Sequence, residues 1–207
     1  GWSVNSAGDV NADGCDDVLI GAMRANPLGR SDAGETYLVY GRSNGFPSLV
    51  ILTNTWLNGS NGVILAGSVA NIFSGGSVHS AGDVNGDGMT DLMMGATGAR
   101  GQAGETYLVY GQSNALPAMI ILTNTWLNGT NGVVLAGASA GDWSGCSVSS
   151  AGDVNGDGFD DLLVGACQAD PNGRDNAGET YLVYGLFSDA AATEICAPSP
   201  RRRSSAL

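Results

Sequence analysis

Residues 83–91 read Asp-Val-Asn-Gly-Asp-Gly-Met-Thr-Asp, and close copies of this loop stand at residues 9–17 (Asp-Val-Asn-Ala-Asp-Gly-Cys-Asp-Asp) and 153–161 (Asp-Val-Asn-Gly-Asp-Gly-Phe-Asp-Asp). Every copy has an oxygen-bearing side chain at loop positions 1, 3, 5 and 9, and glycine at position 6. A hard cation such as Ca²⁺ takes about six to eight oxygen ligands, which alternate residues of a tightly curled loop can supply. The glycine permits the sharp turn that brings in the backbone carbonyl of position 7. The three loops therefore predict three calcium sites.

The expected ligands follow one rule in every copy. The side chains of positions 1, 3, 5 and 9 contribute oxygens, and position 7 contributes its backbone carbonyl. The predicted sets are Asp9, Asn11, Asp13, Cys15 and Asp17; Asp83, Asn85, Asp87, Met89 and Asp91; and Asp153, Asn155, Asp157, Phe159 and Asp161. Position 8 is acidic in two copies but threonine in the other, so we do not assign it as a ligand.

The residues after each loop distinguish it from an EF-hand. An EF-hand loop places a bidentate acid at position 12 and continues into a helix. Position 12 here is Ile20, Met94 or Val164, and the acid stands at position 9. Each loop is followed by a short apolar run that ends in Gly-Ala, which is typical of a buried strand. We therefore expect each loop to be a metal-binding turn between two strands.

The whole chain is a repeat array. The first loop begins 74 residues before the second, and the second begins 70 residues before the third. The segment Gly-Glu-Thr-Tyr-Leu-Val-Tyr-Gly occurs unchanged at residues 34–41, 104–111 and 178–185, and residues 51–62 match residues 121–132 at 11 of 12 positions. Such fixed-period self-similarity in a strand-rich chain indicates a solenoid or a propeller.

Each repeat contains four candidate strands, which in the second repeat span roughly residues 76–81, 91–96, 105–110 and 132–135. Four antiparallel strands per unit fit a propeller blade. We therefore expect an all-β chain that forms a partial β-propeller of three four-stranded antiparallel blades. The expected units are blade 1 at 1–67 with its first strand truncated, blade 2 at 68–137, blade 3 at 138–187 without its last strand, and a disordered tail at 188–207.

These motifs resemble the FG-GAP repeat of integrin α-chain propellers and their bacterial relatives. The resemblance covers residues 1–185, and its specific part is the Asp-x-Asn-x-Asp-Gly-x-x-Asp loop joined to the Gly-Ala strand end. It implies that the chain is a fragment of a seven-bladed ring, with Ca²⁺ in the turn between the first two strands of a blade. It also implies a scaffold for extracellular recognition or cell adhesion.

Composition excludes several other classes. The formal net charge is −12, the chain has no lysine, and three of its eight arginines are residues 201–203. A nucleic-acid surface needs a basic stripe, which is missing here. No apolar stretch reaches the roughly 18 residues of a transmembrane helix. We expect an extracellular or cell-surface location, with the periplasm as an alternative.

The partner is expected to be a protein or a glycan, and open blade edges also predict self-association. Trp56 and Trp126 recur at the blade period and could stack on sugars, although packing between blades is the commoner role for such residues. We find no Ser/His/Asp set, no Cys/His pair and no phosphate-binding loop, so we do not expect an enzyme. The alternative is a carbohydrate-binding or accessory propeller of a larger secreted enzyme.

Cys146 and Cys167 fall nearly opposite each other across the third loop and have no cysteine counterparts in the other two repeats. A local disulfide would suit a secreted protein. Two small buried thiols are the alternative.

Overall fold

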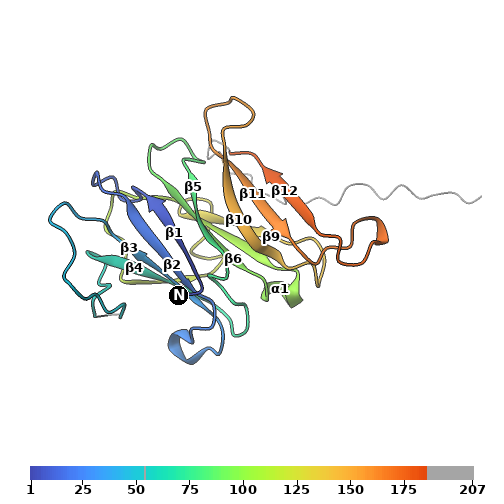
Figure 1. Ribbon diagram of the computed structural model, residues 1–207, viewed down its shortest axis with the longest axis horizontal. Helices are drawn as coiled ribbons and strands as arrows, with labels where there is room; N and C mark the ends of the chain where they lie inside the picture. Colours follow the sequence, from blue (N-terminus) through green and yellow to red (C-terminus); the bar gives the residue numbers. More distant parts are fainter. Residues whose placement is uncertain (54, 186–207) are drawn as a thin grey trace, which may run out of the picture.

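The computed structural model describes residues 1–53 and 55–185; the tail predicted at 188–207 lies outside the described residues. Three β-sheets, one per repeat, follow one another along the chain from blue through green to orange (Figure 1). The partial propeller predicted from the sequence is therefore confirmed. The blade 1 sheet contains β1 (Ser3–Gly8), β2 (Asp17–Ala22), β3 (Glu35–Val39) and β4 (Gly62–Gly67).

The other two sheets repeat this arrangement. Blade 2 is built from β5 (Val78–Gly82), β6 (Asp91–Ala96), β7 (Glu105–Val109) and β9 (Gly132–Ala136), within two residues of the ranges expected from the sequence. Blade 3 contains β10 (Ser144–Gly152), β11 (Asp161–Ala166) and β12 (Glu179–Val183). Short helical turns connect the second and third strands: η1 (Pro27–Gly29), α1 (Ala99–Gln102) and η2 (Pro171–Gly173). None of the helices in the described residues is long or apolar enough to cross a membrane.

One register is repeated in all three blades. The second and third strands pair antiparallel, with Val18 opposite Val39 in blade 1 and equivalent pairs in blades 2 and 3. The first strand pairs with the second up to a β-bulge beside the acidic loop, after which Gly8 faces Asp17. The same bulge precedes both other loops. Because bulges bend a strand and increase its twist, this irregularity sets the direction in which each loop leaves the sheet.

The hydrophobic core lies between blades. One cluster joins blade 1 to blade 2 and includes Leu19, Leu38, Leu92 and Met94, all of which are fully buried. A second cluster joins blade 2 to blade 3. Trp126 packs against the first of these clusters, in the inter-blade role that the sequence favoured for both tryptophans. Trp56 instead packs against a third cluster, formed by Val39, Leu57, Ile64 and Ala66 of blade 1. Because the first two clusters each combine residues of two sheets, neighbouring repeats depend on one another to bury apolar surface.

A strand that the sequence pattern did not predict crosses from one blade to another. Residues 119–122 form β8 (Met119–Leu122), which pairs parallel with the outer strand β4 of blade 1 and makes that sheet five-stranded. The crossover begins where the Ile64 N–H donates to the Ala118 carbonyl at 2.9 Å. Ile120 and Leu122 are buried in the cluster between blades 1 and 2. The matching residues 49–52 form no strand, although both segments are apolar and are identical at two of their four positions.

Shortening one leucine side chain in each of the two matching segments tests this difference. We expect Leu122→Ala to destabilise the chain by about 2–5 kcal/mol, because it leaves a cavity in the inter-blade core. Leu52→Ala is the matched control and should cost less, since Leu52 is only half-buried. Urea unfolding of both variants measures the difference, and equal losses of stability would contradict the assigned role of β8.

Candidate metal centres

The three acidic loops occupy equivalent places, each joining the first strand of a blade to the second. Positions 4 and 6 of each loop adopt left-handed backbone angles; in the second loop these are Gly86 at φ 75° and Gly88 at φ 84°. Glycine adopts this conformation without steric cost. Ala12, at position 4 of the first loop, has φ 58° and therefore carries some strain there. The curl required by the sequence prediction is thus present in all three copies.

Side chains at positions 1, 3 and 5 converge within each loop. In the second loop, the two carboxylate oxygens of Asp83 accept the N–H groups of Asp87 at 3.1 Å and Gly88 at 2.8 Å. Asn85 Oδ1 accepts the same Asp87 N–H at 2.9 Å, and Asn85 Nδ2 donates to Asp87 Oδ2 at 2.9 Å. The first and third loops repeat these contacts through Asp9, Asn11, Asp13 and Asp153, Asn155, Asp157. Three of the predicted donor side chains are therefore brought together in every copy.

The aspartate at position 9 has a structural role that the spacing did not reveal. The Asp91 side chain is fully buried and accepts two backbone N–H groups, from Val84 at 3.0 Å and from Gly111 at 2.8 Å. Gly111 lies two residues after the end of the third strand of the blade, so one carboxylate connects the loop to a distant part of the chain. Asp17 and Asp161 make the same pair of hydrogen bonds. The only sequence signal for this link is the glycine that ends each Gly-Glu-Thr-Tyr-Leu-Val-Tyr-Gly segment.

Burial and neighbouring charge act against ionisation of the position 9 aspartates in the first two loops. Desolvation raises the pKa of Asp17 to about 6 and that of Asp91 to about 7, against an ordinary value of 3.8. The hydrogen bonds from the backbone oppose this rise, and the carboxylates at positions 5 and 1 add to it. The acids of one loop therefore interact unfavourably when all are ionised.

The donor chemistry of each loop fits a hard cation, since the predicted ligands are all oxygens. In the described residues, however, no three His, Cys, Asp or Glu side chains are gathered into a group that could hold a metal ion. The position 9 carboxylate is not part of such a group, because both of its oxygens accept hydrogen bonds from backbone N–H groups. The structure thus brings together the side chains of positions 1, 3 and 5. The position 9 carboxylate accepts hydrogen bonds from backbone N–H groups instead.

Adjacent loops also contact each other through position 8. Asp160 accepts the Asp83 N–H through Oδ2 at 2.8 Å, and its own N–H donates to the Asp83 carbonyl at 3.0 Å. In the first two loops, the Thr90 N–H likewise donates to the Asp9 carbonyl, at 3.2 Å. Position 8 of one loop is therefore a link to position 1 of the loop in the preceding blade. Polar residues at position 8 are the one signal of this link in the sequence.

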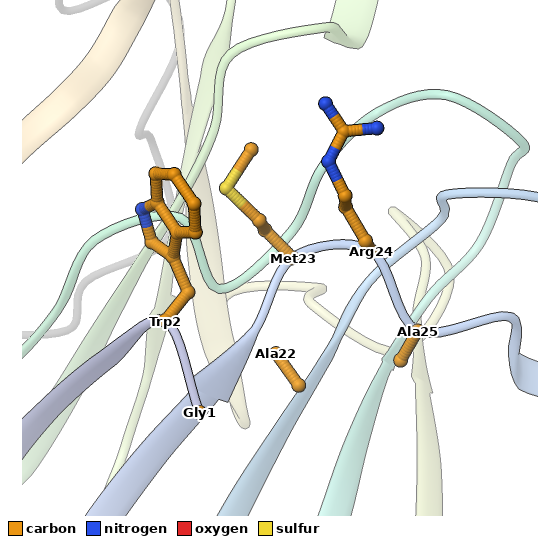
Figure 2. Close-up of a pocket in the computed structure, with 6 residues that line it drawn as sticks. All are labelled: Gly1, Trp2, Ala22, Met23, Arg24 and Ala25. Atoms are coloured by element: carbon orange, nitrogen blue, oxygen red, sulfur yellow. The ribbon is translucent and has the colours of Figure 1, made fainter.

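A cavity of about 310 Å³ lies at the end of the β1–β2 hairpin that is remote from the loop. Its lining residues, shown in Figure 2, are Gly1, Trp2, Ala22, Met23, Arg24 and Ala25. This lining contains one cation but no carboxylate, hydroxyl or thiol, so it offers neither a nucleophile nor a general base.

Cys146 and Cys167 are free thiols that lie in contact, with the Cys167 N–H 3.2 Å from the Cys146 sulfur. Cys167 is exposed and Cys146 is half-buried. Cys146 and Cys167 therefore lie close together, as the sequence predicted. They are not the two buried thiols of the alternative, because Cys167 is exposed.

Fold and loops together define a propeller segment whose blades each carry an acidic turn between the first and second strands. The family profile of the FG-GAP repeat matches residues 1–39, 74–109 and 147–183, which is more than half of the chain. The chain belongs to the FG-GAP repeat family. Each matched segment contains the first three strands of one blade, with the acidic loop between the first two.

Curated proteins with related sequences cover most of the chain. Integrin alpha-5 of Xenopus laevis is 30% identical over 177 residues, which are 82% of this chain and 15% of that protein. Phosphatidylinositol-glycan-specific phospholipase D of Bos taurus is 28% identical over 183 residues, which are 84% of this chain and 19% of that protein. Integrin alpha pat-2 of Caenorhabditis elegans is 28% identical over 193 residues, 87% of this chain and 13% of that protein. The chain thus spans less than a fifth of the length of each of these three relatives.

The raised pKa values at position 9 predict an unusual pH dependence when calcium is removed. The folded state holds protons on Asp17 and Asp91 that the unfolded state releases above about pH 4. In EGTA, the contribution of these groups to the free energy of unfolding should therefore fall as the pH rises from about 4 to about 7. Urea unfolding across this range measures the slope, which Asp91→Asn should make shallower. An unchanged slope in this variant would contradict the assignment to Asp91.

Proposed function

We propose that this chain is a calcium-stabilised propeller segment that serves as a scaffold for extracellular recognition or cell adhesion. The observation that carries the proposal is the triple recurrence of one oxygen donor set at one place in the fold, with the side chains of positions 1, 3 and 5 already converging. The proposed ligands in each loop are these three side chains, the position 7 carbonyl and the position 9 carboxylate.

Charge balance supports occupation of these loops by a divalent cation. Eleven of the 20 acidic residues lie within the three loops, and the chain as a whole has a formal net charge of −12. A divalent ion bound in a loop offsets the repulsion among its carboxylates and favours ionisation at position 9. Because the ion would bind the folded loop, it would stabilise the folded state.

The position of the loops supports a scaffolding role for the metal. Each loop contacts the end of the third strand of its own blade through position 9, and the neighbouring loop through position 8. An ion held here would fix both the geometry within a blade and the contact between two blades. We propose no catalytic role for the chain, since an all-oxygen calcium site built from one loop serves structure more readily than it serves the open coordination position of metal catalysis.

Recognition would then use the surfaces that the blades present, with a protein or a glycan as the partner. The similarity to integrin alpha-5 and integrin alpha pat-2 supports adhesion and an extracellular or cell-surface location. The similarity to phosphatidylinositol-glycan-specific phospholipase D supports the second candidate, an accessory propeller attached to an enzyme. A glycan array combined with a binding screen against extracellular proteins tests both candidates: binding to a protein would favour the adhesion role, and binding to glycans alone would favour the accessory role.

Calcium removal tests the scaffold proposal directly. Each occupied site stabilises the fold by about 2.7 kcal/mol at a calcium concentration about 100 times its Kd. Since about 1 kcal/mol shifts the Tm of a chain of this size by about 2–4 °C, EGTA should lower the Tm by at least about 10 °C. Mg²⁺ should restore little of this loss, because it requires a smaller octahedral site. A melting curve that EGTA leaves unchanged would exclude occupied loops.

Two substitutions in the first loop distinguish a ligand from a neighbouring acid of equal charge. Asp13→Ala removes the position 5 carboxylate and should reduce the number of calcium ions bound from three to two. Asp16→Ala is the matched control, because position 8 is exposed and is not a proposed ligand, and it should leave three sites. Isothermal titration calorimetry gives the stoichiometry, and loss of one site in both variants would show that the assigned ligand positions are wrong.

A further inference from the structure

Cys146 and Cys167 stand on the two strands of the first hairpin of blade 3, at the end of the hairpin remote from its acidic loop. Cys146 lies within β10, and Cys167 is the first residue after β11. The acidic loop at 153–161 lies between them along the chain. A covalent bond between the two side chains would therefore close the open end of the hairpin that carries this loop.

The regular pairing of the two strands is interrupted where Cys146 lies. β10 pairs with β11 at Ser147 and again at Ser144, with a register shift between these two pairs. The Cys146 N–H donates instead to the Trp143 carbonyl, at 3.1 Å. Contact with the opposite strand at this position is therefore made by the Cys146 side chain.

The Cys146 side chain lies directly against Cys167. Its sulfur accepts the Cys167 N–H at 3.2 Å, and its S–H donates to the Gly165 carbonyl at 3.5 Å. A backbone nitrogen is two bonds from the Cβ of its own residue, so the first of these contacts brings the Cys146 sulfur next to the Cys167 side chain. The two residues thus meet the basic requirement for a disulfide, which is a close approach of their side chains.

Blade 1 shows the same relation between side chains at these two positions. The counterpart of Cys146 is Trp2, and the counterpart of Cys167 is Met23. Figure 2 shows Trp2 and Met23 side by side in the lining of one cavity. The corresponding positions of blade 2 hold no cysteine. A thiol pair at this corner of the blade is therefore a feature of the third repeat.

The two thiols differ in how they would react. Burial raises the pKa of the Cys146 thiol to about 11, and a hydrogen bond with the Cys167 side chain adds to this rise. Cys146 is therefore protonated at neutral pH, whereas the thiolate is the form that attacks a disulfide. Cys167 is exposed, so a dissolved oxidant reaches it first. Its counterparts Met23 and Thr97 are only half-buried although another blade follows each of them, so this corner stays accessible within the array.

We propose that Cys146 and Cys167 are an oxidation site, which a low-molecular-weight disulfide such as oxidised glutathione converts into an intrachain disulfide that clasps the hairpin. The Cys167 thiolate attacks one sulfur of the oxidant; a mixed disulfide forms, the S–S bond of the oxidant breaks, and one thiolate leaves and takes up a proton. Cys146 then loses its proton and attacks the Cys167 sulfur, which releases the second half of the oxidant as a thiol. Two protein thiols are oxidised, and one oxidant disulfide is reduced to two thiols.

The closeness of the two side chains favours the second step, because a neighbouring group reacts as if it were present at high concentration. The bond that forms joins residues 21 positions apart, and it restricts the unfolded chain accordingly. A cross-link over this separation should raise the Tm of the oxidised chain by about 6–12 °C relative to the reduced chain.

Mass spectrometry of the full chain tests the pairing. Cleavage after arginine places Cys146 and Cys167 in one peptide, residues 101–174, which contains no other cysteine. Cys15 and Cys196 fall in two other peptides. The chain is treated with oxidised glutathione, unfolded in the presence of N-ethylmaleimide and digested with trypsin. Peptide 101–174 should be unalkylated and lighter than its dithiol form by two hydrogen atoms, whereas the other two cysteines should be alkylated or joined to glutathione.

Serine variants test the clasp and the order of the two steps. Cys146→Ser and Cys167→Ser should each remove the Tm difference between the oxidised and the reduced chain. Cys196→Ser is the matched control, because it removes a cysteine from outside the hairpin, and it should keep the difference. In Cys146→Ser, peptide 101–174 should carry glutathione, since the first step remains possible and the second does not. Circular dichroism verifies that each variant is folded.

A doubly alkylated peptide 101–174 after oxidation would overturn the proposal, and so would a bond from either cysteine to Cys15 or Cys196. Equal Tm values for the oxidised and the reduced chain would overturn the clasp. The melting curves are recorded in calcium and in EGTA, which keeps this outcome distinct from the calcium proposal: a Tm difference that persists in EGTA supports the disulfide whether or not the loops bind calcium.

Discussion

One buried carboxylate per blade holds the architecture together. The aspartate at loop position 9 lies at the start of the second strand and accepts backbone N–H groups from the acidic loop and from the glycine after the third strand. A buried carboxylate is tolerated only when such hydrogen bonds satisfy it. The loop, the first hairpin and the third strand are consequently fixed relative to one another by a single side chain, and the three copies of this arrangement give the blades the same shape.

Blades of one shape can pack in a repeating manner. Each of the two joints combines apolar residues of two sheets, so neighbouring blades cover surface that a single blade would leave exposed. Stability of this kind is a sum of terms within repeats and between neighbours. Glycines at fixed positions allow the backbones to approach closely at each joint; Gly21 and Gly95, for example, have no room for a side chain.

The acidic loops place 11 of the chain's 20 acidic residues at equivalent hairpin ends, so the proposed metal binding would be linked to blade packing. In the metal-free arrangement, burial and mutual repulsion raise the pKa of the position 9 acid in the first two loops. A cation there would remove this penalty while also fixing the contact between position 8 of one loop and position 1 of the next. The scaffold role proposed for calcium follows from this location rather than from any reactive group.

The sequence determined the repeat period, the four strands of a blade and the position of each acidic loop, because these depend on local patterns: short apolar runs, turn glycines and ligand spacing. It also identified positions 1, 3 and 5, whose side chains converge through contacts within one loop. The tertiary structure alone decided the features that join distant residues. These are the two hydrogen bonds of Asp91, the bridge from Asp160 to Asp83, and the pairing of β8 with β4. Residues 119–122 show the physical reason: they form a strand by pairing with β4, which lies far away in the sequence, whereas the matching apolar residues 49–52 form none.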